Sequence, residues 1–280
     1  MKKSFNFIAG CAVAAVLVVS GCATTKVPAQ PDPKRVLLVT ATLGFVHKCI
    51  PLSEQVLNDL SRSNGTFVIV DTITSGKKPK DEAQAAQWMD NLKKEFAQKM
   101  SAEALKNYDG VIFDNTTGDL PLDVDALLAW VRAGGAFIGM HAATDTFHSS
   151  PAFIDMIGGE FLHHGPQLKV DCINQDPEHP ATKHLGPTYE VFDEIYQFTH
   201  FCRPCVHGLL ALDRKPDVKD PVPGDYPVSW CKQVGKGKVF YTSLGHREEV
   251  WVSDKYQKHI LGGINWALGL EPGSAVPQVK

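Results

Sequence analysis

The stretch GGAFIGMHAATD, Gly134 to Asp145, decides the fold of this chain. Two glycines end a helical pattern, a short run of mostly apolar residues follows, and the run finishes at His141. This order predicts a buried strand that turns sharply and delivers a histidine at its carboxyl end. In an open α/β sheet, ligands bind at that edge because loops and helix N-termini converge there. An imidazole in this place can move a proton or hold a metal at neutral pH, whereas a histidine that only caps the turn would need no ligand.

The segments before this strand alternate in a regular way. Residues 36–40, 67–73 and 108–115 are apolar or β-branched runs, as in the central strands of a parallel sheet. Helical patterns separate them at residues 51–60, 82–99 and 122–132. The sequence therefore predicts an α/β fold, a doubly wound and mostly parallel sheet with helices on both faces. In the second half we expect strands at residues 167–173, 208–212, 226–232 and 238–243, and helices at residues 154–159 and 254–268.

The first 21 residues are predicted to be a lipoprotein signal peptide. Lys2 and Lys3 precede an apolar run over residues 8–19 that is short for a membrane span, and small residues lead to Cys22. We expect Cys22 to be lipidated and residues 22–34 to form a proline-containing tether; an uncleaved anchor helix is the alternative. In both cases the body lies in the cell envelope, on the outer-membrane or periplasmic side of a Gram-negative cell. Residues 35–270 form the predicted domain, and residues 271–280 a loose tail.

The charge balance argues against one class of partner. Without Lys2 and Lys3, 26 of the 28 basic residues remain against 31 acidic ones, which gives a net charge of −5. Basic residues form no stripe with interleaved aromatic residues, so nucleic acid is not expected as a partner. An uncharged small molecule such as a sugar fits this composition.

Five cysteines remain in the body, an odd number for an oxidising compartment. Cys202 and Cys205 have CxxC spacing, which fits a short disulfide, a redox pair or half of a zinc site. The sequence has no second CxxC, so a zinc site with four cysteines is excluded. A structural disulfide or two ordinary thiols are favoured, because the pair lies in a loop-like run.

Several histidines follow predicted strands. His47 lies in the loop after the strand at residues 36–40, and His246 follows the strand at residues 238–243. Both are expected at the same sheet edge as His141, where they would face one cleft; as loop histidines they would only meet solvent. Asp145, four residues after His141, would share a helix face with it and orient the imidazole or bind substrate hydroxyls, unless it only caps a helix.

Two further segments carry candidate groups. Asp193 and Glu194 lie between Phe192 and Ile195, which suggests partial burial. A desolvated carboxyl group has a raised pKa and makes a useful acid or base. His163 and His164 are adjacent, so at most one of them can point to a site in regular structure.

These segments occur in an order that resembles the ThuA-like trehalose-utilisation family, from Arg35 to Gly269. The motifs are VTATLGFVHKCIP, DGVIFDNTTGD, GGAFIGMHAATD, GGEFLHHGP, DPEHPATKHL, DEIYQF, YPVSWCKQVGKGKVFYTSLGH and HILGGINWALG. The resemblance implies a flavodoxin-like fold similar to class I glutamine amidotransferases. Those enzymes carry a cysteine at the elbow after the strand, where this chain has His141, so amidotransfer is not expected. The chain departs from the family pattern at Val46, where an arginine is common, and in having two histidines at His163 and His164.

The resemblance also implies a role in the catabolism of trehalose and related disaccharides through their 3-keto forms. A lyase, hydrolase or isomerase of keto-sugars or keto-glycosides would use the catalytic candidates His141, Asp145, Glu194 and His246. The substrate-binding candidates are His47, His164 and Tyr196, and a divalent metal would have His141, His164 and His246 as ligands. The alternative is a sugar-binding lipoprotein without enzymatic activity, and an amide or ester hydrolase is remote because Thr144 and Ser149 lack a GxSxG context.

Overall fold

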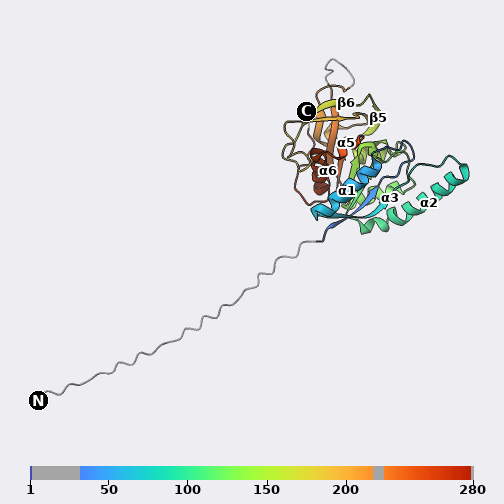
Figure 1. Cartoon of the computed structure of the whole chain (residues 1–280), viewed down its shortest axis with the longest axis horizontal. Coiled ribbons are helices and arrows are strands. Elements are labelled where there is room, and N and C mark those ends of the chain that lie inside the picture. Colours follow the sequence, from blue (N-terminus) through green and yellow to red (C-terminus); the bar gives the residue numbers. More distant parts are fainter. Residues whose placement is uncertain (2–31, 217–223, 279–280) are drawn as a thin grey trace. The chain divides into compact units, whose positions relative to one another are not determined.

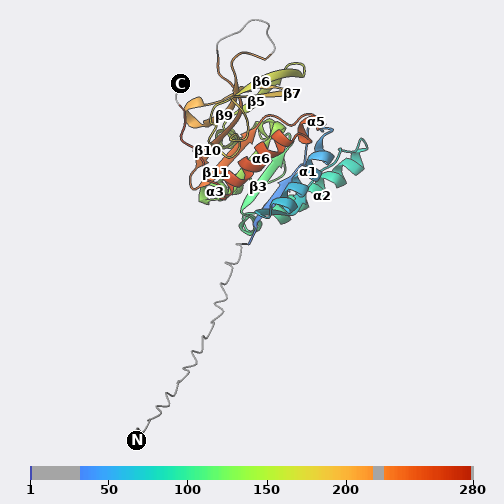
Figure 2. The same cartoon turned by 60° about the vertical axis from the view of Figure 1, so that its left-hand side comes forward.

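A mixed sheet of nine strands forms the centre of the computed structural model, in the order β2-β1-β3-β4-β11-β10-β9-β6-β7 (Figure 1, Figure 2). The structure describes Met1 and residues 32–216 and 224–278. The predicted signal peptide and Cys22 lie outside the described residues. The compact unit that carries all the elements spans Asp32–Lys280. None of the helices in the described part of the chain is long and apolar enough to cross a bilayer.

Five neighbouring strands are parallel, as the apolar runs of the sequence predict. They are β2 (Phe67–Ile73), β1 (Lys34–Val39), β3 (Gly110–Asp114), β4 (Ala136–Met140) and β11 (Gly237–Thr242). The central strands β3 and β4 are buried at every residue, because helices cover both faces of this half of the sheet. The prediction of an α/β fold with a parallel core is confirmed.

The other half of the sheet is antiparallel. It contains β10 (Tyr226–Val234), β9 (His207–Leu212), β6 (Leu168–Asn174) and β7 (Thr188–Asp193). A separate pair of strands, β5 (Glu160–His164) and β8 (Tyr196–Thr199), lies beside it. The sequence interpretation missed β5, β7 and β8. The predicted parallel arrangement therefore holds only for β1 to β4 and β11. The strands β10, β9, β6 and β7 extend the sheet by antiparallel pairing.

Helices cover both faces of the parallel half. The helices α1 (Ile50–Asn64) and α6 (Asp254–Ala267) pack on the face that includes Val36 and Leu38. On the face that includes Leu37 and Val39 lie α2 (Glu82–Met100), α3 (Val124–Ala133) and α4 (Pro151–Ile157). Alternate residues of β1 thus enter two different hydrophobic cores, as the period-2 geometry of a strand requires. A last short helix, α5 (Glu248–Trp251), precedes α6.

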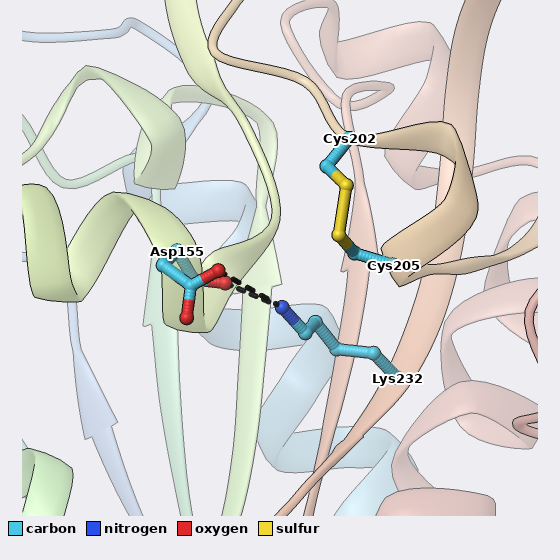
Figure 3. Close-up of a disulfide and its surroundings, with 4 residues drawn as sticks. All are labelled: Asp155, Cys202, Cys205 and Lys232. Atoms are coloured by element: carbon cyan, nitrogen blue, oxygen red, sulfur yellow. Dashed lines mark hydrogen bonds and ion pairs between the residues drawn. A yellow bond between two sulfur atoms is a disulfide. The ribbon is translucent and has the colours of Figure 1, made fainter.

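Cys202 and Cys205 form a disulfide in the turn before β9 (Figure 3). Of the alternatives for the CxxC motif, the structure therefore has the short disulfide. Nearby, Lys232 of β10 donates to the backbone carbonyl of Asp155 at 2.5 Å and lies 3.8 Å from its carboxylate. The remaining body cysteines, Cys49, Cys172 and Cys231, are buried free thiols.

The chain end is more ordered than the sequence suggests. The indole of Trp266 donates to the carbonyl of Gly273 at 3.1 Å, and the imidazole Nδ1 of His207 donates to the carbonyl of Val276 at 2.7 Å. Residues 273–278 form no helix or strand, but backbone carbonyls of this segment accept hydrogen bonds from the body.

Candidate active site

His141 stands at an elbow directly after β4. Its φ is +46°, a left-handed conformation that residues other than glycine rarely adopt, and its side chain is fully buried. The chain continues as a 3-10 turn, η2 (His141–Asp145). A Cβ at Gly139 would lie 3.0 Å from the ring of Tyr241 and 3.1 Å from Ile157, so the strand packs closely just before the elbow. A left-handed backbone such as that of His141 is strained, and strain of this kind is common where a structure fixes a functional side chain.

The hydrogen bonds of His141 define which nitrogen carries the proton. Its Nδ1 lies 2.7 Å from the backbone carbonyl oxygen of Ser243. A carbonyl only accepts, so Nδ1 is the donor, and in the neutral form of the ring the lone pair is on Nε2. The hydroxyl of Tyr196 lies 3.1 Å from Nε2 and donates to it. Burial raises the pKa of Tyr196 well above its ordinary value, which keeps this hydroxyl protonated.

Glu194, in the connection between β7 and β8, joins three imidazoles. Its Oε2 is 3.2 Å from Nδ1 of His246 and 3.6 Å from Nε2 of His141, while Oε1 is 3.3 Å from Nδ1 of His164. Burial alone would raise the pKa of Glu194, but its interactions with His141 and His246 outweigh burial and lower it. The raised pKa expected for this acid is therefore not found, and Glu194 is an ionised carboxylate.

The neighbouring acid, Asp193, has a different role. It is fully buried and accepts hydrogen bonds from the backbone N–H of Gly245 at 2.7 Å and of Arg247 at 3.2 Å. These two amides flank His246 in the sequence, so Asp193 fixes the loop that carries this histidine. Burial raises the pKa of Asp193 despite the nearby His141. The expectation that this pair of acids is buried is confirmed.

His47 completes the cluster from the loop between β1 and α1. Its ring centroid is 4.8 Å from that of His141 and 5.3 Å from that of His246, and its buried Nδ1 has no hydrogen-bond partner among the described residues. Burial, together with the nearby His141 and His246, lowers the pKa of His47 to about 2, so its ring is neutral. One ligand atom from each of four residues lies within 4.8 Å of the others; these residues, the inner cluster, are His47, His141, Glu194 and His246.

His164 and Tyr196 lie beside the inner cluster rather than in it. The ring of His164 stacks on that of Tyr196 at 6.3 Å, and its side chain is half-exposed. The metal set proposed from the sequence contained His164; in the structure His47 stands with His141 and His246 instead. The sequence interpretation had placed His47 only among the substrate-binding residues.

Asp145 does not contact His141. Its Oδ1 lies 2.7 Å from Nε2 of His148, whose Nδ1 is 2.5 Å from Glu160. The expected shared helix face fails because η2 is a 3-10 turn, in which residues i and i+3, not i and i+4, lie one above the other. Sequence reasoning missed His148 and Glu160; the i, i+3 spacing of Asp145 and His148 is the signal that would have found the first of them. Glu249, three residues after His246, forms an ion pair with Arg247 at 2.9 Å.

The inner cluster reaches solvent at His246. His141, His47 and Glu194 are buried, whereas the side chain of His246 is 20% exposed and lines a cavity of about 400 Å³. A second cavity, of about 800 Å³, includes His47 in its lining and shares Phe45 and Lys48 with the first. Phe45 is 63% exposed, so an aromatic face stands between two cavities beside the inner cluster.

The family model described as ThuA, trehalose utilisation, matches residues 35–267 of this chain. The chain belongs to the ThuA family. This membership agrees with the resemblance seen in the sequence motifs. No curated protein matches the chain at a significant level.

Solved structures support the same fold. A protein from Parabacteroides merdae described as ThuA-like superposes with a TM-score of 0.67 at 19% identity, covering 88% of this chain and 93% of that one. A protein from Bacteroides uniformis, also described as ThuA-like, gives a TM-score of 0.63 at 23% identity, covering 84% and 91%. A β-galactosidase from Bacillus circulans matches with a TM-score of 0.51 at 10% identity, over 85% of this chain and 30% of that one. At these identities the likeness concerns the fold alone.

Proposed function

We propose that this ThuA-family protein is an enzyme of carbohydrate catabolism that acts on keto-sugars, with 3-keto-disaccharides such as 3-ketotrehalose as the substrate class. The observation that carries the proposal is the convergence of Glu194 and the lone pair of His141 with two further imidazoles at the ligand-binding edge of the sheet. Binding a neutral sugar needs few ionisable groups, whereas proton transfer needs groups of this kind. The description of the family as trehalose utilisation supports the choice of a sugar.

The chemistry follows from the substrate. A ketone makes the proton on the neighbouring carbon acidic, and its removal is the first step shared by elimination and isomerisation. His164 and His246 contact opposite oxygens of Glu194 and are both partly exposed, so a substrate can reach them. In the proposed step the imidazole of His164 or of His246 accepts the proton. An N–H or O–H group of the site then donates to the ketone oxygen of the substrate, on which negative charge develops.

A sugar-binding lipoprotein is the second candidate, because of Phe45. An exposed aromatic ring between two cavities can stack on a sugar face without any chemistry. The two candidates differ in what happens to a keto-sugar after it binds.

Turnover of 3-ketotrehalose tests the enzyme. We expect the detergent-solubilised full-length protein to convert 3-ketotrehalose but not trehalose, since only the ketone acidifies the neighbouring proton. Products are followed by mass spectrometry, with and without divalent metal and chelator. His164→Ala should lower turnover by about 100-fold or more, the usual contribution of a general base. Binding of the keto-sugar without conversion under every metal condition would reject the enzyme in favour of the binding protein.

The proposed location is the cell envelope, with the chain held to a membrane by lipid on Cys22. The support is the lipobox-like sequence before Cys22 and the tether over residues 22–34. We expect the wild-type chain to incorporate a palmitate analogue in cells and to partition into detergent, and Cys22→Ser to do neither. Cys11→Ser, a cysteine within the signal, is the matched control and should be labelled like the wild type. An unlabelled wild-type chain would contradict the anchor.

A further inference from the structure

We propose that the inner cluster, His47, His141, Glu194 and His246, binds one divalent transition-metal ion. The binding itself can be argued from the cluster alone, whereas the role given below to the ion rests on the proposed function. Among residues 32–216 and 224–278, this is the one group of three or more histidine, cysteine or acidic side chains whose ligand atoms converge in this way.

The spacing of the ligand atoms matches a metal site. Bonds of about 2.0–2.1 Å to zinc in a tetrahedral site place two ligand atoms roughly 3.3 Å apart. Nε2 of His141 is 3.3 Å from Nδ1 of His246 and 3.6 Å from Oε2 of Glu194, and the last two atoms are 3.2 Å apart. The fourth ligand, a ring nitrogen of His47, lies within 4.8 Å of the others, so only a small inward shift of this ring completes the set.

Hydrogen bonds from neighbouring residues fix the tautomer of His141 and the position of His246. The carbonyl of Ser243 accepts a hydrogen bond from Nδ1 of His141, so Nε2 is the nitrogen that can bind a cation, in place of the hydrogen bond that it accepts from Tyr196. Such outer hydrogen bonds are typical of metal-binding histidines. Asp193 fixes both amides that flank His246. Buried polar atoms normally have a partner, so the unpartnered Nδ1 of His47 marks a ring that lacks one of its expected interactions.

The donor set selects the class of ion. Three imidazoles and one carboxylate suit zinc, cobalt, nickel or ferrous iron, whereas magnesium and calcium prefer oxygen ligands. A second histidine and acid group, Asp145, His148 and Glu160, does not compete, because both ring nitrogens of His148 are already bound to carboxylates.

Metal binding by the inner cluster decides which imidazole can accept the proton in the proposed reaction. With His246 bound through Nδ1, His164 is the partly exposed imidazole that stays free for proton transfer. A bound divalent ion would polarise the ketone of the substrate if the ketone oxygen were added to the four protein ligands as a fifth. His164 contacts the oxygen of Glu194 opposite to the one in the inner cluster, so it lies next to the site without being a ligand.

Metal binding is measured on the full-length protein in detergent, after treatment with chelator and in the absence of any sugar. Isothermal titration with Zn²⁺ and elemental analysis after dialysis should give one ion per chain, and Co²⁺ should give a visible d–d spectrum. His47→Ala and His47→Gln should each weaken Zn²⁺ binding by about 100-fold or more, since even outer-sphere changes cost up to that much. His163→Gln, at an exposed imidazole outside the inner cluster and its contacts, is the matched control and should stay within about threefold of the wild type. Mg²⁺ should not compete.

The outcomes separate this proposal from the proposed function. A wild-type chain that binds no stoichiometric Zn²⁺ or Co²⁺, or a folded His47→Gln variant that binds as the wild type does, would overturn the metal site even if keto-sugars are converted. Stoichiometric binding without any conversion would uphold the site and reject the enzyme. Circular dichroism and thermal melting of both His47 variants establish that a loss of binding is not a loss of the fold.

Discussion

His141→Asn is expected to lower kcat/KM for 3-ketotrehalose by about 1,000-fold while the protein stays folded. Asparagine tolerates the left-handed backbone at φ +46°, and its side-chain amide can replace Nδ1 as the donor to the carbonyl of Ser243. It cannot replace the Nε2 lone pair, which faces Glu194, His246 and the hydroxyl of Tyr196. In the proposed reaction this lone pair holds the metal ion beside His164, so its loss would remove the ion and the activation of the ketone that the ion would supply. Groups that act directly on the reacting atoms typically contribute factors of about 100 to 10,000.

The measurement is steady-state turnover with folding checked by thermal melting. His163→Ala is the control, because His163 is an exposed imidazole outside the inner cluster and its contacts, and we expect its kcat/KM to stay within about twofold of the wild type. A folded His141→Asn variant that keeps turnover within tenfold of the wild type would show that the elbow histidine does not serve the reaction.

The parallel part of the fold could be predicted because it leaves the strongest trace in a sequence. Strands such as β3 and β4 are buried on both faces and are therefore continuous apolar runs. The strand β7 was missed although its burial alternates at every second residue, with Tyr189, Val191 and Asp193 inside. A charged residue at a core position breaks the apolar alternation, and Asp193 is there because it binds the loop of His246.

The sequence predicts which histidines belong to the site, but it does not predict which groups each of them contacts. His47, His141 and His246 follow strands, and parallel strands that end at one edge bring such residues together. The partners of each ring depend on turn geometry and on long-range packing. The 3-10 form of η2 turns Asp145 toward His148, and the carbonyl that fixes the tautomer of His141 comes from Ser243, 102 residues away. No local pattern records either fact.

A second large effect is expected from Asp114, which ends β3 inside the core. Its carboxyl group is fully buried, forms a hydrogen bond with the hydroxyl of Ser53 and accepts one from the side-chain amide of Asn115. Burial outweighs these two bonds and raises the pKa of Asp114 to about 7, and the charge of Glu54 acts in the same direction. The folded protein thus favours the neutral acid.

The sign of the pH dependence follows from proton binding. Below the ordinary pKa of 3.8, Asp114 is protonated in both the folded and the unfolded chain. Between pH 3.8 and about 7 the unfolded chain loses this proton and the folded chain keeps it, so the free energy of unfolding falls as the pH rises. Above about pH 7 the loss is complete, and it amounts to at most about 4 kcal/mol.

Asp114→Asn should remove this loss. The amide keeps a carbonyl oxygen for Asn115, and its NH₂ can donate to the hydroxyl of Ser53, which already donates to the carbonyl of Ile50 at 2.9 Å. The variant should therefore gain stability relative to the wild type as the pH rises from 4.5 to 8, by up to about 3 kcal/mol, measured by urea unfolding at several pH values. Asp59→Asn, at an exposed carboxylate paired with Arg62 at 3.6 Å, is the control and should leave the shape of the wild-type pH curve unchanged.

Parallel curves for Asp114→Asn and the wild type would mean that the buried carboxyl group carries no proton in the folded protein at neutral pH. In that case its hydrogen bonds, rather than burial, would set its charge.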